Sequence, residues 1–333
     1  MSPMLGARWD EPGQNARFQK AHERELVDYA EVNFPIPWQT DPSETGLPVI
    51  AHTSSNPTCS AHGIDSRIAE LVREGARAAN SPWIGEHLSW LGSASSGSLG
   101  YQINPLFTRD FHAIAVENIL KLKDFYDLPL ALELSPIYTG ATGYESEMHF
   151  LGDVAVAADT SIILDVTHWQ IANKNLNRTP DYGLDALPRE RIIELHIAGM
   201  RQGSDGYWHD SHGFLPPDEI FDLIQELVAD LPSLRAVTYE HLADAPEARE
   251  VLDDGRPHQL AARRPRRQPL EHDGLQRGAR RVDRRRVAGR AGADHHDVLD
   301  VEGARLAHRE VERARRRGDA QRGRHAEAQR ENG

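Results

Sequence analysis

Short, continuously apolar runs alternate along the chain with longer segments of helical spacing. The runs have the length and the β-branched or aromatic content of strands, and they span residues 5–9, 29–34, 47–53, 82–88, 128–134, 161–168, 192–198 and 235–241. Between them, apolar residues recur at helical spacing, as over 64–79, 111–127 and 217–231. Runs that are apolar on both faces are typical of parallel sheets, and their alternation with helices predicts repeated βαβ units.

Eight such strands within residues 1–241 match the size of one closed barrel. An open, doubly wound sheet is the alternative, but no G-x-G-x-x-G motif follows the first strand. The pattern therefore predicts an α/β protein with a (β/α)8 TIM barrel, which we expect to occupy residues 1–254 as one domain.

The composition changes after Asp254. Residues 255–333 contain no Phe, Tyr, Trp, Ile, Met, Lys, Ser, Thr or Cys, and Arg, Ala, Gly and Asp dominate them. Such a segment cannot bury enough apolar surface to offset the entropy lost on ordering. Three interpretations stay open: a disordered or loosely helical Arg-rich tail, a shifted reading frame in a GC-rich gene, and a basic arm for nucleic acid.

The net charge of −13 is unevenly distributed. Residues 1–254 carry 17 Lys and Arg against 39 Asp and Glu, whereas residues 255–333 carry 21 Arg against 12 acidic residues. An acidic body argues against nucleic acid as the main partner, because phosphate binding needs clustered basic residues. The lone cysteine, Cys59, excludes an intramolecular disulfide and a Cys-based metal site, and we expect it to be an inert small residue.

Two further absences concern membranes. No run of 18 apolar residues occurs, so we expect no transmembrane helix and no membrane partner. The N-terminus lacks a basic stretch followed by an apolar core, as a secretory signal would have. A cytoplasmic protein is therefore expected.

Ionisable residues stand at the C-terminal ends of most of the predicted strands. They are His52, His87, Glu133, Asp165 with His168, His196 and Glu240, and the segment WHDSHG after the seventh strand adds Asp210 and His212. The C-terminal ends of barrel strands meet at one mouth, where active sites lie. Burying such groups without partners costs several kcal/mol each, so an isolated role for all of them is implausible.

Metal ions would remove that cost, because they neutralise carboxylates and order imidazoles. Nine candidate ligands exceed the needs of one ion, so the set predicts two or three ions. Imidazole and carboxylate without thiolate favour iron, manganese or zinc over magnesium or calcium. The ligand types alone leave the choice among those three metals open.

Seven motifs carry a resemblance to a known family. VIAHTSS, GEHLSW, ALELSP, LDVTHWQIANKN, ELHIAGM, HDSHG and VTYEH occur in this order within residues 4–245. Together they resemble the multinuclear non-heme iron-dependent oxidases, which include the methanobactin-biosynthesis oxidase. Each motif alone is a weak signal, whereas the order and spacing of all seven are specific.

The resemblance implies a TIM-barrel enzyme that holds two or three iron ions and uses O2 to oxidise a residue, often cysteine, of a ribosomally made precursor peptide. It also implies a partner protein that recognises the peptide. Carried over motif by motif, the resemblance assigns three ligand groups: His52, His87 and Glu133 on one side, Asp165, His196 and Glu240 in the centre, and His168, Asp210 and His212 at a third site. His168 stands where many relatives have Asn.

Two other function classes remain. A metal-dependent sugar isomerase or endonuclease-like hydrolase would place His, Asp and Glu at the same strand ends, and a non-catalytic metal-binding scaffold would need no further chemistry. Dependence on Fe(II) and O2 separates the oxidase from both.

Two segments were expected to border the mouth. The Gly- and Ser-rich residues 91–100 lack the G-K-[ST] of a phosphate loop, so they predict a mobile loop over the site. Asn173, Lys174 and Asn175 are expected in the loop after the sixth strand, where they could line the mouth.

Overall fold

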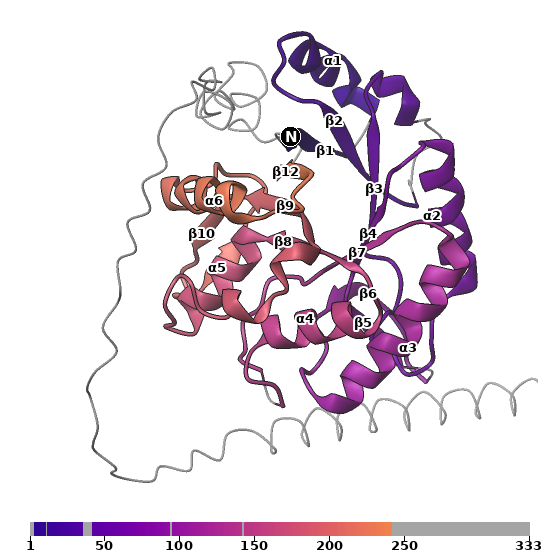
Figure 1. The fold of residues 1–333 in the computed structure, drawn as a ribbon, viewed down its shortest axis with the longest axis vertical. Helices are drawn as coiled ribbons and strands as arrows, with labels where there is room; N and C mark the ends of the chain where they lie inside the picture. The colour runs from indigo at the N-terminus through magenta and orange to yellow at the C-terminus, as the bar shows by residue number, and fades with distance from the viewer. Residues whose placement is uncertain (1–2, 11, 36–41, 94, 142, 242–333) are drawn as a thin grey trace, which may run out of the picture. The chain divides into compact units, whose positions relative to one another are not determined.

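The computed structural model describes residues 3–10, 12–35, 42–93, 95–141 and 143–241 (Figure 1). The predicted domain boundary at residue 254 and the Arg-rich tail over 255–333 lie outside these residues. Across the described part of the chain, no helix combines the length and apolar character that a membrane crossing requires.

Eight parallel strands close into a barrel in the order β1-β12-β9-β8-β7-β4-β3-β2 (Figure 1). Their bounds are β1 Met4–Trp9, β2 Tyr29–Asn33, β3 Val49–Thr53, β4 Ile84–His87, β7 Leu130–Glu133, β8 Ser161–Asp165, β9 Ile192–Ala198 and β12 Ala236–Glu240. Seven strands fall within the predicted runs and β1 begins one residue before its run, so the predicted TIM barrel is confirmed.

Helices connect most of the strands and lie outside the barrel (Figure 1). They are α1 Asn15–Glu23, α2 Ser66–Ala78, α3 Arg109–Tyr126, α4 Glu147–Ala157, α5 Val166–Asn175 and α6 Asp218–Asp230, with short 3-10 turns at Pro12–Gln14, Pro42–Thr45, Leu184–Ala186 and Arg189–Arg191. Side-chain caps define several starts: Asp65 accepts from backbone N–H groups of α2, and Thr108 from one of α3.

Two predicted boundaries were wrong. The sixth strand ends at Asp165 rather than at His168, because the Asp165 side chain caps α5 and the helix starts at once. Residues 91–100 were expected as a mobile loop, but they belong to a hairpin of β5 (Trp90–Ser93) and β6 (Gly97–Ile103). A second hairpin, β10 (Met200–Gln202) with β11 (Trp208–Asp210), follows β9.

The inside of the barrel has an apolar floor and a polar layer above it. The floor is a separate buried cluster of Tyr29, Ile50, Trp83, Ala131, Ile163, Ile193 and Ala236. Successive side chains of a strand alternate between its two faces, so the residue two positions further along points inward again. For four of these strands that residue is Glu31, His52, Glu133 or Asp165.

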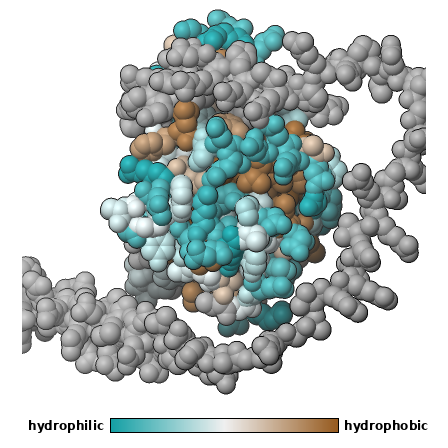
Figure 2. Space-filling model, turned by 90° about the vertical axis from the view of Figure 1, so that its left-hand side faces the viewer, coloured by the Kyte–Doolittle hydropathy of each residue, from teal (hydrophilic) through white to brown (hydrophobic). Residues whose placement is uncertain are grey.

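The larger apolar core lies between the strands and the surrounding helices, and it includes Phe18, Val72, Ile119, Phe150 and Leu227. On the face shown in Figure 2, hydrophilic side chains predominate between smaller apolar patches. This arrangement buries the apolar faces of the helices and leaves the barrel interior to the floor and the polar layer.

Gly85, on β4, makes room for one side chain of that polar layer. A Cβ atom at this position would lie 2.5 Å from Cδ2 of His52 and 2.8 Å from Cδ1 of Ile163. Both distances are far below an ordinary van der Waals contact, so any larger residue must displace the imidazole or the floor.

Gly85→Ala should therefore both destabilise the fold, by about 1–3 kcal/mol, and weaken metal binding by moving His52. Urea unfolding and metal titration of the variant measure the two effects. Gly140→Ala is the matched control, since its Cβ would meet only a side-chain atom of Arg178 at 3.8 Å. Wild-type stability and affinity in Gly85→Ala would contradict this account of the packing.

Candidate metal centre

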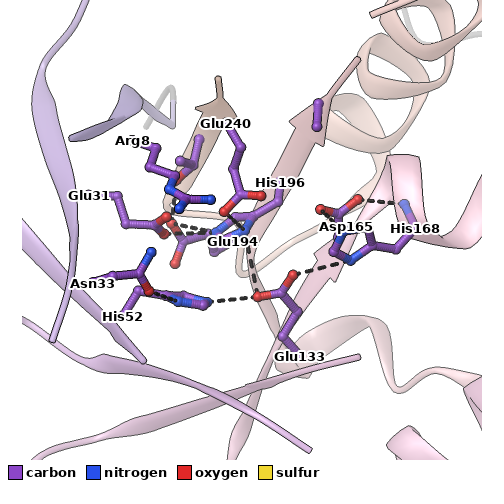
Figure 3. Close-up of polar contacts among 12 residues, drawn as sticks. Arg8, Glu31, Asn33, His52, Glu133, Asp165, His168, Glu194, His196 and Glu240 are labelled. Atoms are coloured by element: carbon purple, nitrogen blue, oxygen red, sulfur yellow. Dashed lines mark hydrogen bonds and ion pairs between the residues drawn. The ribbon is translucent and has the colours of Figure 1, made fainter. Parts of the chain in front are cut away.

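All nine candidate ligands meet at the C-terminal end of the barrel, although they come from distant parts of the chain. Figure 3 shows His52, Glu133, Asp165, His168, His196 and Glu240 among them. In each of the three groups assigned from sequence, one ligand atom per residue lies within 4.8 Å of the others; the groups are His52–His87–Glu133, Asp165–His196–Glu240 and His168–Asp210–His212. The geometry thus permits metal binding by all three groups.

Glu133, at the end of β7, lies close to four of the five imidazoles of the cluster. Its Oε2 atom lies 2.8 Å from Nε2 of His52, 3.3 Å from Nε2 of His87 and 3.6 Å from Nδ1 of His196. Its Oε1 atom lies 3.5 Å from Nδ1 of His168. Because the side chain is 1 % exposed, water cannot balance its charge, and the four imidazoles must do so with protons or metal ions.

The turn from β8 into α5 fixes Asp165 and His168 together. Oδ1 of Asp165 accepts a hydrogen bond of 2.7 Å from the backbone N–H of His168, which caps the helix. The other carboxylate oxygen, Oδ2, is left 3.4 Å from Nε2 of the same histidine and faces the cluster. One local motif therefore supplies two candidate ligands with little conformational freedom.

The third group is more exposed and lies on less regular structure. Asp210 ends β11, and His212 follows it in the next turn, with side chains 20 % and 14 % exposed. Nε2 of His212 lies 3.0 Å from Oδ2 of Asp210 and 3.3 Å from Oε2 of Glu240. Glu240 thus links this group to the central one, since its Oε1 lies 3.6 Å from Nδ1 of His196.

The groups of potential ligands overlap. Glu133 belongs to a group with His52 and His87 and to another with Asp165 and His168, and Asp165 belongs also to the central group. Carboxylates that face two neighbouring ligand groups suit ions that lie side by side, because each of the two oxygens can bind one ion.

Buried polar atoms that form no hydrogen bond point into the same space. They include Oε1 of Glu133, Oδ2 of Asp165, Nδ1 of His196, Oδ1 of Asp210 and Nε2 of His212. Leaving such atoms unsatisfied is costly, whereas coordination by a cation would satisfy them. Imidazole nitrogens and carboxylate oxygens without a thiolate are ligands for iron, manganese or zinc. The donor set therefore fits the metals expected from sequence.

Electrostatics reflect the density of acidic groups. Burial lowers the pKa of His52, but the charges of Glu31 and Glu133 outweigh burial and raise it to about 9. Burial likewise opposes protonation of His168, yet Asp165 and Asp210 raise its pKa to about 10. These imidazoles hold protons because the surrounding carboxylates need positive charge.

In two other groups the effect of burial on the pKa outweighs that of the neighbouring charges. Burial lowers the pKa of His87 to about 4, which keeps its imidazole neutral and ready to bind a cation. Burial raises the pKa of Asp165 to about 7, only partly offset by His168. The site therefore combines groups that carry a proton with groups that lack one, and bound metal would replace the protons.

The sequence interpretation missed three residues of the mouth: Arg8, Glu31 and Asn33. Arg8, on β1, donates to Oδ1 of Asp10 at 2.7 Å and contacts Nδ1 of His212 at 3.1 Å. Glu31 stands within the apolar run of β2, and a charged residue in such a run is the signal that could have identified it. Asn33 ends the same strand.

A cavity of about 530 Å³ opens onto the cluster. Arg8, His52, His87, His168, His212 and Glu240 line its polar part. Leu91 and Gln102, from the β5–β6 hairpin, line another part, so the segment expected as a loop does border the mouth. The volume is in the range of ligand pockets and would admit an amino-acid side chain with its backbone.

The three residues expected in a loop at the mouth lie elsewhere. Asn173, Lys174 and Asn175 end helix α5, and none of them lines the cavity. Asn173 donates to the Pro180 carbonyl, Lys174 pairs with Glu219, and the side chain of Asn175 bonds the backbone of Trp208. These contacts hold the helix to its neighbours. The three residues lie away from the mouth because α5 starts directly after Asp165.

Cys59 is buried, and burial raises the pKa of its thiol to about 12, in agreement with the inert role expected for it.

The barrel and its imidazole–carboxylate cluster have the architecture of a TIM-barrel enzyme with side chains at its mouth that could hold metal ions. Residues 29–261 match the family model of the RiPP precursor modification enzymes MbnB/TglH/ChrH, which act on ribosomally synthesised and post-translationally modified peptides. The chain belongs to this family, and the resemblance drawn from its seven motifs is confirmed.

Individual relatives are more distant. A UPF0276 protein of Caulobacter vibrioides is 28% identical over 213 residues, which cover 61% of this chain and 75% of that protein. A UPF0276 protein of Streptomyces avermitilis is 30% identical over 172 residues, 50% of this chain and 35% of that protein. Among solved structures, a protein from Rhodospirillum rubrum assigned as a xylose isomerase has a TM-score of 0.51 at 16% identity, covering 78% of this chain and 99% of that chain. That likeness shows the barrel fold alone.

Metal affinity should depend on pH in a direction set by His52 and His168. Without metal these imidazoles hold protons up to about pH 9 and about pH 10, and coordination requires them to be deprotonated. The apparent affinity for a divalent cation should therefore rise with pH up to that range, by about tenfold per pH unit for each proton displaced. Calorimetric titration in buffers of different ionisation enthalpy counts the protons released, and an affinity that is constant between neutral and alkaline pH would contradict the expectation.

Proposed function

We propose that this protein binds two or three iron ions at the barrel mouth and uses O2 to oxidise a residue, most simply a cysteine, of a ribosomally synthesised precursor peptide. His52, His87 and Glu133 would hold one ion, and Asp165, His196 and Glu240 the central ion. His168, Asp210 and His212 would hold the third.

One observation carries the proposal: neighbouring ligand groups share carboxylates. Glu133 and Asp165 each face two groups, which is the arrangement that adjacent metal ions require. A single-ion enzyme would not need nine such side chains within one continuous cluster. Family membership adds the substrate class, because the enzymes of this family modify RiPP precursors.

The charge of the cluster supports several ions. Arg8 and the half-buried Asp10 form an ion pair and cancel each other. The remaining carboxylates of the cluster are all buried or nearly so; they are Glu31, Glu133, Asp165, Glu194, Asp210 and Glu240. Three divalent cations would balance these six charges, whereas one ion would leave most of them to be balanced by protons.

Iron bound at this site would supply one-electron redox chemistry with O2, which none of the surrounding side chains provides. The chain's own contribution is to hold neighbouring ions through shared carboxylates and to receive the substrate. Ile68, Leu91 and Pro136 give the cavity an apolar wall, while Arg8 lines the polar side. A cysteine thiolate entering from the open side would meet the ligands His87 and His168 at the cavity surface.

The family membership also motivates a partner. We propose that a separate protein presents the precursor peptide to the mouth, and that the reaction takes place in the cytoplasm, where ribosomal peptides are made. A sugar isomerase or hydrolase on the same barrel is the competing function, and it would work without O2.

Protein produced with iron under low oxygen should contain two or three iron ions per chain. The reason is the overlap of the ligand groups, which leaves no single position that uses all of the donors. Elemental analysis together with protein quantification measures the ratio. At most one ion per chain after full reconstitution would refute the multinuclear centre.

Glu240→Ala and His196→Ala should each lose metal and oxygen consumption with a precursor peptide, since both lie in the central group. His22→Ala and His149→Ala are matched controls that should change neither. In these helices Nδ1 of His22 bonds the Val27 carbonyl, and Nδ1 of His149 bonds the Ser146 hydroxyl, away from the mouth.

Metal content and an oxygen electrode give the two readouts for each variant. Glu240→Ala with full metal and turnover would remove β12 from the centre. Turnover of a substrate in the strict absence of O2 would favour the isomerase or hydrolase instead.

A further inference from the structure

Strand β2 contributes none of the nine candidate ligands predicted from sequence, yet its inward side chains reach two of the histidines. Tyr29 belongs to the apolar floor, Glu31 lies one layer above it, and Asn33 lies at the rim, in the alternation of a strand. Glu31 is fully buried. In Figure 3, Glu31 and Asn33 point toward His196 and His52 from the side opposite Glu133.

Asn33 contacts His52 at the nitrogen that faces away from the carboxylates. Its Oδ1 atom lies 2.9 Å from Nδ1 of His52, and the two residues are register partners on adjacent strands. The other nitrogen of the ring, Nε2, lies 2.8 Å from Glu133. The amide oxygen can only accept a hydrogen bond, so Nδ1 is the nitrogen that donates.

Glu31 has a similar place beside His196, although the contact is an ion pair and its direction does not meet the criterion for a hydrogen bond. Its Oε2 atom lies 2.9 Å from Nε2 of the ring, while Nδ1 faces Glu133 and Glu240 at 3.6 Å each. A carboxylate oxygen and an imidazole lone pair at such a distance would repel, so Nε2 carries the proton. Glu194 lies behind the contact, 3.5 Å from Nε2.

We propose that β2 is the orienting strand of the metal centre: Glu31 and Asn33 hold one nitrogen of His196 and of His52 and thereby turn the other nitrogen of each ring toward the carboxylates with which it would share an ion. The inference rests on the proposed metal centre but not on the metal or the substrate. Partners of this kind fix the tautomer and raise the basicity of a ligand imidazole. The Leu134 carbonyl has the corresponding place behind His168, 2.9 Å from its Nδ1.

Glu31 could instead be a ligand, since Glu31, His52 and His196 also come close enough to share an ion. The surroundings favour the orienting role. An ion at Nε2 of His196 would lie on the opposite side of the ring from Glu133 and Glu240, beside the fully buried Glu194 and away from the cavity. Glu194 is already engaged there, as it accepts hydrogen bonds from Trp83, Thr238 and Tyr29.

Cobalt(II) is a suitable probe, because it binds imidazole and carboxylate sites and its visible spectrum reports the coordination geometry. Glu31→Gln keeps the volume and removes the charge, and Asn33→Leu removes the acceptor at a half-buried position. Each variant should bind as many cobalt ions as the wild type, with affinity about 10–100-fold weaker and an altered spectrum. Asn33→Asp, unlike Asn33→Leu, keeps an oxygen acceptor for His52 and should have most of the wild-type cobalt affinity.

Glu86→Gln is the matched control. Glu86 is as buried as Glu31 and precedes the candidate ligand His87, but its carboxylate accepts from Asn56, Tyr126 and the backbone N–H of His87, and none of its hydrogen bonds is with an imidazole of the centre. Its cobalt affinity and spectrum should equal those of the wild type. Thermal unfolding of each metal-free variant checks that the fold is retained.

The outcomes separate the roles. Loss of one cobalt ion in Glu31→Gln would make Glu31 a ligand and overturn the orienting role, as would unchanged affinity and spectrum in both Glu31→Gln and Asn33→Leu. A wild-type protein that binds no cobalt at all would instead refute the metal centre of the proposed function.

Discussion

Concentrated negative charge in the mouth of a closed barrel is the constraint on which this structure depends. Glu133 is almost completely buried, and Glu31 and Glu194 are fully buried around it. Carboxylates in such a place are tolerated only with positive charge in contact. The five imidazoles of the cluster can provide it as protons or by binding metal ions, and the raised pKa values of His52 and His168 show how strongly the site attracts either.

The barrel supplies the geometry that keeps these groups together. Strand alternation places an apolar residue in the floor and a polar one directly above it, as in Ile50 with His52 and Ala131 with Glu133. The floor closes the lower side, so the cluster is open only toward the cavity. Small residues then complete the fit, and Gly85 is the clearest case because its missing side chain leaves the space for the His52 ring.

The sequence was sufficient for the barrel and for the positions of the candidate ligands at strand ends, because both follow from the period of two along buried strands. The sequence did not predict the position of Asn173, because a side chain determines where the helix begins. Asp165 caps α5 directly after the strand, and the helix takes Asn173 away from the mouth. Glu31 and Asn33 were missed for another reason. The charge of Glu31 within an apolar run marks it as unusual, but the contact of either residue with one nitrogen of a distant histidine is a relation between two strands that the spacing of neither strand shows.

The three ligand groups differ in how firmly the protein holds them. His52 and His196 are fixed on barrel strands and contacted from behind by β2, whereas Asp210 and His212 follow a small hairpin and are partly exposed. Nδ1 of His212 is contacted by Arg8, a group that can only donate, whereas His52, His168 and His196 have acceptors in the corresponding place. Any cation at this outer group must therefore compete with a guanidinium for the same imidazole, so the two inner groups form the rigid part of the centre and the outer group its adaptable part.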